Sequence, residues 1–322
     1  MLAAVERQKN RIGITLVLLA GVLWGTVGPA QLLAGPVAGP AALGGARILV
    51  GGLVLVAVVL ATDPASFRLL TGRAWPAVLA ASAATATFQT AFLTSVATTG
   101  AAVATALTFG VAPVATGICE RIALGTRLTR RWVAGTGCAV VGCALLLTPA
   151  DGVQVDLLGA ALGVLAGACF GVYTVSAKQL IHRGVPMPAA VAVTLLVGGA
   201  ALAPWTLAAL PAFTTPRGLI LVVWLGPITA AAAYWFFVTG LRRVSAATAG
   251  TLSLVEPLVA AALAVLLLGE RLSAPVTAGA VLLLGGLVVV SAPAGQAVRR
   301  APTPTATAAR TRPPRASRNA SR

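Results

Sequence analysis

Apolar stretches of about twenty residues alternate with short polar segments along most of the chain. A helix of that length crosses the roughly 30 Å hydrocarbon core of a bilayer. Turn residues such as Gly35-Pro36 and charges such as Arg242-Arg243 separate the stretches. The pattern predicts an all-α membrane protein of about ten transmembrane helices. The predicted spans lie at residues 12–34, 41–61, 75–96, 101–123, 131–149, 157–178, 188–209, 218–239, 245–269 and 275–294.

The composition excludes a soluble globular protein. Of 322 residues, 58% are hydrophobic and 9% are charged, and the mean hydropathy is +0.95. Soluble domains carry about a quarter charged residues, which they need to cover a water-facing surface. The net charge of +16 could indicate nucleic-acid binding, but the basic residues lie in short loops and the C-terminal segment. We therefore expect the lipid bilayer, and no nucleic acid, as a partner.

Residue types that hold metals and cofactors are scarce. The four cysteines lie inside apolar stretches without a CxxC pair, and His182 is the only histidine. This pattern indicates neither a disulfide framework nor a metal site. The chain also lacks the GxxxxGK[ST] loop that binds nucleotide phosphates in ATP-driven pumps. We expect no metal, no cofactor and no primary pump.

The cations indicate how the chain is threaded through the membrane, because cytoplasmic loops are enriched in Lys and Arg. With the N-terminus inside, 20 of the 23 Lys and Arg residues fall in predicted cytoplasmic segments. Arg217 and Arg271 fall outside, and Arg47 lies within a span. The distribution predicts a multi-pass inner (plasma) membrane protein with both termini in the cytoplasm.

The first apolar stretch follows three cations, as in a secretory signal peptide. However, Gly13, Gly21 and Gly25 each have a counterpart 146 residues later in the chain. The tripeptide Leu19–Gly21 likewise recurs as Leu165–Gly167. A segment with a second copy belongs to the fold, so we count it as the first span.

The internal repeat continues to the end of the apolar region. Residues Leu124–Thr129 correspond to Leu268–Ser273, and Pro113 corresponds to Pro257, at an offset of 144 residues. Each unit has five predicted spans, and an odd number inserts the second copy with inverted topology. Inverted repeats are characteristic of secondary transporters, in which matched elements rock to give alternating access. The predicted organisation is a cytoplasmic N-terminus at 1–11, repeats at 12–149 and 157–294, and a disordered basic cytoplasmic tail at 295–322.

Three stretches resemble the EamA-type branch of the drug/metabolite transporter superfamily. They are Leu254–Pro257 followed by Leu267–Leu272, the weaker copy Ala112-Pro113 followed by Leu124–Leu128, and the opening helix with Trp24-Gly25. The resemblance covers residues 12–294 and implies a ten-helix transporter with a central cavity for small organic solutes. Family members often carry Glu in both copies of the Leu-Gly-Glu motif, whereas the first copy here has Thr126.

Two charged residues within the spans are candidates for substrate binding or coupling. Glu256 is the one acid expected near the bilayer midplane, where a charge costs about 2.5–3.5 kcal/mol and so usually faces a cavity or a partner. Burial favours its protonated form, which suits a reversible proton carrier. The alternative is a structural role, in which the protonated side chain beside Pro257 hydrogen-bonds to a neighbouring helix. Arg47 could attract an anionic group or pair with Glu256, but we favour the alternative that its side chain snorkels to the outer surface.

Aromatic and polar side chains below the interfaces could line an amphipathic solute pocket, or simply pack between helices. They are Trp24, Phe88, Gln89, Tyr173, Tyr234 and Trp235.

Prolines and glycines within the spans suggest kinks and close helix contacts. Pro113 and Pro257 lie at equivalent positions, where each removes a backbone donor and either shapes a central site or only curves its helix. One stripe of small residues recurs at every fourth position of the sixth span, which allows close helix approach. We expect it to pack within the molecule, with a homodimer as the alternative. The stripe consists of Gly159, Gly163, Gly167 and Gly171.

The sequence thus predicts a secondary transporter, an exporter of small organic metabolites or drugs with possible proton coupling. An uncoupled facilitative carrier or channel is the first alternative, because the spans hold essentially one acid. A membrane-embedded enzyme is the second, and the lack of clustered acids, histidines or a nucleophile dyad argues against it.

Overall fold

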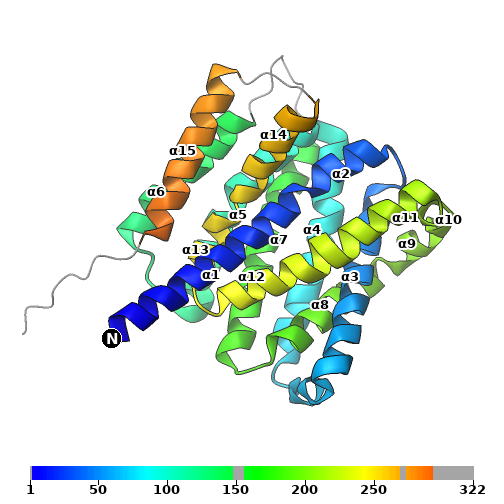
Figure 1. The fold of residues 1–322 in the computed structure, drawn as a ribbon, viewed down its shortest axis with the longest axis horizontal. Helices are drawn as coiled ribbons and strands as arrows, with labels where there is room; N and C mark the ends of the chain where they lie inside the picture. The colour runs from blue at the N-terminus through cyan, green and yellow to red at the C-terminus, as the bar shows by residue number, and fades with distance from the viewer. Residues whose placement is uncertain (1, 148–155, 269–272, 293–322) are drawn as a thin grey trace, which may run out of the picture. The chain divides into compact units, whose positions relative to one another are not determined.

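The computed structural model describes residues 2–147, 156–268 and 273–292, and these ranges are helical almost throughout, with no strand (Figure 1). The fold class predicted from the sequence is therefore confirmed. The first half contains α1 (Leu2–Gly25), α2 (Val27–Ala34), α3 (Pro40–Thr62), η1 (Pro64–Leu69), α4 (Trp75–Thr99), α5 (Ala101–Leu124) and α6 (Arg130–Leu146). The second half contains α7 (Leu157–His182), α8 (Met187–Ala201), α9 (Ala203–Ala208), α10 (Leu210–Phe213), α11 (Pro216–Val223), η2 (Trp224–Ala232), α12 (Ala233–Leu241), α13 (Ala246–Leu252), α14 (Val255–Leu268) and α15 (Ala274–Ser291).

Within these ranges, 8 helical segments are long and apolar enough to cross a membrane. They match eight of the predicted spans, and the first helix begins earlier than residue 12, at Leu2. The other two spans are shorter, because α6 has 17 residues and α8 has 15. The predicted tail and the Leu-Gly-Glu motif at 268–272 lie outside the described residues, apart from the backbone of Leu268.

Three predicted spans are interrupted: 12–34 at Thr26, between α1 and α2, and 188–209 and 245–269, where a proline follows the break. The span at 188–209 is not continuous, because α8 ends at Ala201 and Pro204 lies in the first turn of the short helix α9. The span at 245–269 is interrupted at Ser253-Leu254, between α13 and α14. Ser253 lies four residues before Pro257, which is the carbonyl position that a proline ring displaces. By contrast, Pro113 lies inside the continuous helix α5, so the equivalent prolines have different effects.

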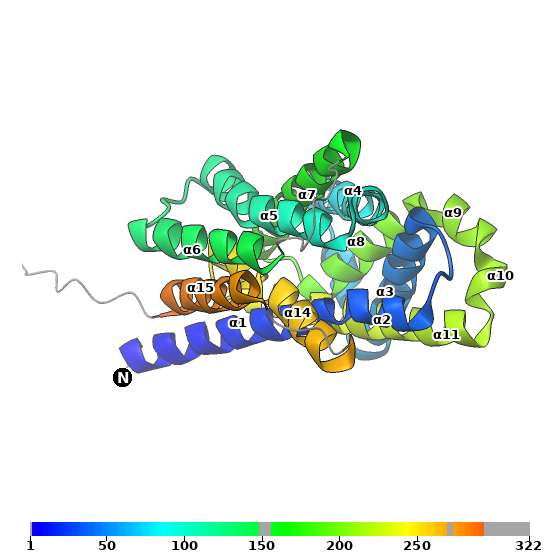
Figure 2. The same ribbon diagram turned by 90° about the horizontal axis from the view of Figure 1, so that it is seen from above.

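The two halves exchange helices in a symmetric way. The opening helix of the first half, α1, packs on α12 and α14, whereas the opening helix of the second half, α7, packs on α4 and α5. The pairs α3 with α8 and α6 with α15 also join equivalent helices, and α6 and α15 lie side by side in both ribbon views (Figures 1 and 2). Exchanging the halves reproduces the packing pattern, as expected for two five-helix repeats.

The glycine stripe of α7 lies against α4 and α5. A Cβ at Gly167 would be 2.5 Å from the carbonyl oxygen of Thr108. The stripe also exposes backbone acceptors, since Ser95 Oγ donates to the Gly159 carbonyl at 2.6 Å and Thr108 Oγ1 to the Gly163 carbonyl at 3.0 Å. Close packing and interhelical hydrogen bonds are the attractions available between helices in lipid. The expected packing within the molecule is present, so a homodimer would need a surface other than this face.

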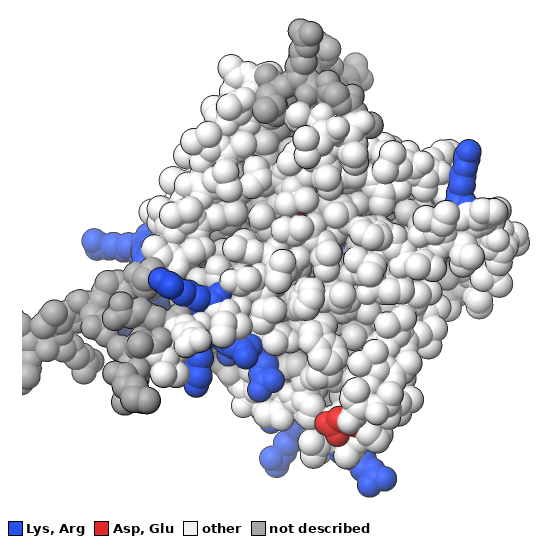
Figure 3. Space-filling view, viewed as in Figure 1, with Lys and Arg blue, Asp and Glu red and all other residues white. Residues whose placement is uncertain are grey.

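Figure 3 shows how charge is distributed on one face of the molecule. Cationic side chains project from the end that holds the start of α1, and uncharged atoms cover the middle of the face (Figure 3). A face with an uncharged middle and cations gathered toward one side is the surface expected of a multi-pass membrane protein.

Candidate substrate cavity

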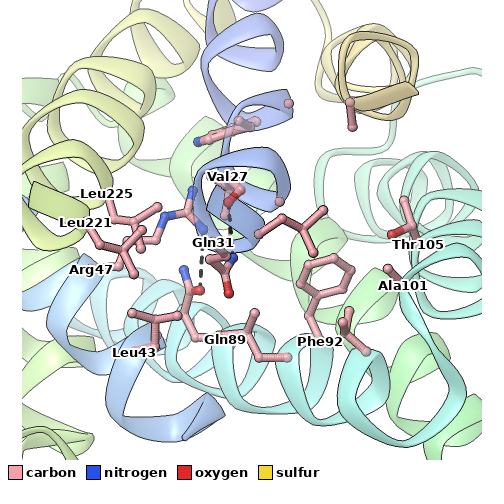
Figure 4. Close-up of a pocket in the computed structure, with 18 of the residues that line it drawn as sticks. Val27, Gln31, Leu43, Arg47, Gln89, Phe92, Ala101, Thr105, Leu221 and Leu225 are labelled. Carbon is pink, nitrogen blue, oxygen red and sulfur yellow. Dashed lines mark hydrogen bonds between the residues drawn. The ribbon is translucent and has the colours of Figure 1, made fainter. Parts of the chain in front are cut away.

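A cavity of about 540 Å³ lies between the two halves of the helical bundle. The first half contributes wall residues from α1 to α5, and the second contributes Glu256 of α14. Leu221 and Leu225, also from the second half, are labelled in Figure 4. The wall reaches the surface at the exposed residues Leu32 and Pro36, beside the α2–α3 loop. The cavity therefore opens at this end of the bundle.

The structure brings six of the predicted site residues into the cavity wall, and these come from both repeats. They are Trp24, Arg47, Phe88, Gln89, Glu256 and Pro257.

Tyr173 and Tyr234 do not line the cavity but lie buried behind Trp24. The ring centroid of Tyr234 is 5.3 Å from that of Trp24 and 5.3 Å from that of Tyr173, with edge-on geometry in both pairs. Phe170 and Phe237 complete this aromatic cluster. The tyrosines therefore support the ring of Trp24 from behind, where a solute in the cavity would not touch them.

Arg47 is buried in the cavity wall, so the expectation that it snorkels to the surface is wrong. Its Nε donates to Thr229 Oγ1 at 3.2 Å and its Nη2 to the Thr229 carbonyl at 3.1 Å. Nη1 donates to Gln89 Oε1 at the limiting distance of 3.5 Å. These acceptors satisfy the guanidinium inside the protein, which removes the reason for it to extend toward water.

The local structure of η2 places Thr229 beside Arg47. This segment is a π-helix with Pro227 inside it, a geometry often found at functional sites. The Thr229 hydroxyl donates to the Leu225 carbonyl at 2.8 Å, which leaves its lone pairs to accept from Arg47. The irregular helix thus presents two oxygens of one residue to the guanidinium.

Glu256 lies in the first turn of α14, directly after the break at Ser253-Leu254. Helix N-termini carry partial positive charge, which stabilises a carboxylate there. Its side chain is half-buried in the wall of the cavity that also holds Arg47, and the opposite charges of the two residues attract. The cavity therefore contains one acid and one base on opposite halves of the molecule.

Comparison with known proteins assigns the fold to a family. A model of the EamA-like transporter family matches the chain twice, over residues 11–148 and 157–292. The chain belongs to the EamA-like transporter family. The resemblance recognised in the sequence is thus confirmed, and the protein is a multi-pass membrane transporter.

Relatives of this EamA protein span nearly its whole length. The "Uncharacterized transporter YwfM" of Bacillus subtilis (strain 168) is 37% identical over 287 residues, covering 88% of this chain and 95% of the relative. The "Uncharacterized inner membrane transporter YicL" of Salmonella typhimurium is 27% identical over 289 residues, covering 88% and 96%. A solved structure entitled "Crystal structure of protein" has a TM-score of 0.72 at 21% identity, covering 86% of this chain and 95% of that chain, and shows the fold alone.

A second pair of buried charges in this EamA protein lies away from the cavity. Glu120 of α5 accepts hydrogen bonds from the backbone N–H groups of Ala246 at 3.0 Å and Ala247 at 2.6 Å, in the first turn of α13. Lys178 Nζ of α7 donates to the carbonyls of Leu241 at 2.7 Å and Val244 at 2.6 Å, at the end of α12. An acid at a helix start and a base at a helix end both complement the helix dipoles.

This polar cluster lies toward the end of the bundle opposite the cavity mouth. On α5 the cavity wall extends from Ala101 to Phe109, and Glu120 lies about 16 Å further along at 1.5 Å per residue. The statement that the spans hold essentially one acid is therefore wrong. Glu120 falls within the predicted span 101–123, and its position there, with Lys178 at the end of 157–178, was the signal that could have revealed the pair.

Proposed function

We propose that the protein is a secondary active exporter of small organic metabolites or drugs, coupled to protons through Glu256. One observation carries the proposal: a cavity between the two repeats contains an ionisable acid and opens at one end, while a separate polar cluster joins the repeats toward the other end. A carrier that alternates its access needs such a central site with a closure on each side. Membership of the EamA-like family supports transport as the activity.

The cation distribution supports an outward-open state for this structure. With both termini in the cytoplasm, the α2–α3 loop faces the outside and the Glu120–Lys178 cluster lies on the cytoplasmic side. The cavity is then accessible from outside and sealed from inside. In the opposite state, the α12–α13 turn would separate from α5 and α7. The cavity would then open to the cytoplasm, where it could bind the solute to be exported.

Glu256 is the residue that we assign to proton coupling. It lines the cavity, so solvent reaches it when the cavity is open and protein encloses it when the cavity is closed. A carboxyl group that alternates between these environments can take up and release one proton per cycle. We assign coupling to Glu256 because it is the one acid among the wall residues of this cavity.

The test begins with a metabolite comparison of cells with and without the protein, in which export predicts depletion of the substrate inside and its appearance outside. The identified substrate is then followed in proteoliposomes with an imposed pH gradient. Glu256→Gln should abolish accumulation against a gradient but preserve exchange at equal concentrations. Glu256→Asp retains a titratable group and should keep part of the accumulation.

Full gradient-driven accumulation by Glu256→Gln would overturn the proton-coupling role. Equal rates with and without a gradient in the unaltered protein would instead indicate an uncoupled facilitative carrier or channel. Chemical conversion of the solute, rather than its movement, would indicate a membrane-embedded enzyme.

A further inference from the structure

The cavity wall contains hydrogen-bond donors that the protein itself leaves unused. The guanidinium of Arg47 has five N–H groups, and its bonds to Thr229 and Gln89 use three of them. Because Thr229 holds Nε and Nη2 from one side, the orientation of the group is fixed. Figure 4 shows Arg47 and Gln89 directed into the same space from α3 and α4.

The amide of Gln89 can be oriented in only one way. Arginine donates and never accepts, so the oxygen of the Gln89 amide faces Arg47 and its nitrogen faces away. The side chain is 1% exposed, and its Nε2 has no hydrogen-bond partner among the described residues. A buried N–H group without an acceptor is unfavourable, which indicates that a ligand supplies one.

Trp24 presents a second unused donor in the same wall. Its ring is 4% exposed and its Nε1, which can only donate, has no partner in the described part of the chain. Tyr234 and Phe170 pack edge-on against the ring and fix its direction. The unpartnered donors of Trp24 and Gln89 and the charge of Arg47 thus belong to three residues of one cavity wall, from α1, α4 and α3.

We infer that the cavity binds the carboxylate of an amphipathic organic anion, through Arg47, Gln89 and Trp24. A carboxylate accepts about four hydrogen bonds and adds a second negative charge, beside that of Glu256, for the Arg47 guanidinium, whereas an alcohol or a neutral amide accepts fewer hydrogen bonds and carries no charge. Phe88, Phe92 and Phe109 form an apolar part of the wall that suits the rest of such a molecule. The inference rests on the proposed transport function only in taking the molecule bound here as the substrate.

Binding to the purified full-length protein tests the inference without any gradient. The probes are acetate, benzoate and 3-phenylpropanoate, with 3-phenylpropan-1-ol and 3-phenylpropanamide as neutral counterparts, measured by calorimetry and by thermal unfolding. We expect 3-phenylpropanoate to bind at least tenfold more tightly than its two neutral counterparts. Absence of binding by every carboxylate at millimolar concentration, or equal affinity for charged and neutral probes, would overturn the inference.

Substitutions separate a binding role from a structural one. Trp24→Phe removes only an unused donor, so carboxylate affinity should fall roughly tenfold while the melting temperature of the empty protein stays the same or rises. Gln89→Met removes an unused donor together with the oxygen that accepts from Arg47, so a similar loss of affinity should come with a lower melting temperature. Trp132→Phe is the matched control, because Trp132 Nε1 also lacks a partner among the described residues but lies outside the cavity wall. It should leave the affinity unchanged.

Equal losses for charged and neutral probes, or unchanged carboxylate affinity in Trp24→Phe and Gln89→Met, would also overturn the inference. Glu256→Gln distinguishes the two proposals, since it should retain carboxylate binding even where it loses gradient-driven transport. Loss of proton coupling in this variant would therefore not contradict the proposed carboxylate site. Conversely, gradient-driven transport of solutes that lack an anionic group would contradict the carboxylate site alone.

Discussion

The carboxylate of Glu120 accepts a hydrogen bond of 3.0 Å from the backbone N–H of Ala246, although 126 residues separate the two along the chain. This bond joins α5 of the first repeat to the first turn of α13 in the second. Lys178 holds the other side of the same turn, through the carbonyls of Leu241 and Val244. Two charges from one end of the bundle therefore fix the connection between α12 and α13.

The first prediction is that Glu120 and Lys178 act as a unit. Glu120→Gln and Lys178→Met should each lower the free energy of unfolding by about 1–3 kcal/mol, because each leaves buried backbone groups poorly satisfied. The double variant should lose less than the sum, since both residues hold one turn. Thermal or denaturant unfolding in detergent measures all three variants. Additive losses would show that the two ends of the turn are held independently.

The second prediction concerns the support of Arg47. Thr229→Val keeps the size of the side chain and the carbonyl bond but removes the hydroxyl that accepts from Arg47 Nε. We expect solute affinity to fall about fivefold, which corresponds to one hydrogen bond of about 1 kcal/mol. Thr85→Val is the control, because the Thr85 hydroxyl bonds only the Ala81 carbonyl of its own helix. Equal effects of the two substitutions would contradict a positioning role for Thr229.

A third prediction contrasts two helical glycines. Gly167→Ala should lower the free energy of unfolding by about 1–3 kcal/mol, since its Cβ would lie 2.5 Å from the Thr108 carbonyl oxygen. Gly137→Ala should leave stability unchanged or raise it by about 0.5–1 kcal/mol, because no atom lies within 4 Å of its Cβ position. Unfolding curves of the two variants should therefore shift in different directions. A stable Gly167→Ala protein would contradict the tight α7–α5 contact.

The fourth prediction fixes the orientation in the membrane. A reporter enzyme that is active only in the periplasm should work when fused at Gly152 and stay silent at Gly184. Gly152 lies outside the described residues, and Gly184 ends the turn after α7 with a φ of 72°. The reverse pattern of activity would show that both termini face the outside.

Span positions could be predicted from the sequence because the bilayer dictates how long an apolar segment must be. The end of α5 was also predictable in physical terms, since Gly125 of the repeated Leu-Gly pair adopts a left-handed φ of 67° that terminates the helix. Pro257 signalled a distortion correctly, but only the structure shows that the helix breaks at Ser253-Leu254 and places Glu256 in a first turn.

Side-chain direction could not be predicted in the same way. Length and hydropathy fix the depth of Arg47 but not the rotation of α3 about its axis, which decides whether the guanidinium meets lipid, water or Thr229. The partners of Glu120 are backbone N–H groups of a distant turn, which carry no distinctive residue type. Tyr173 and Tyr234 have the composition of a binding pocket, yet packing places them one layer behind it.

The exchange of α1 between the repeats has a consequence for how the protein is made. The glycines at 21 and 25 of α1 fit against Val255 and Val259 of α14, which the ribosome completes only near the end of the chain. During synthesis the contact face of α1 therefore lies against lipid until α14 is inserted. By contrast, α4 and α5, on which α7 packs, are inserted before α7. The first helix to be made is therefore among the last to be packed, and a chain that stops after the first repeat lacks both of the helices, α12 and α14, on which α1 packs.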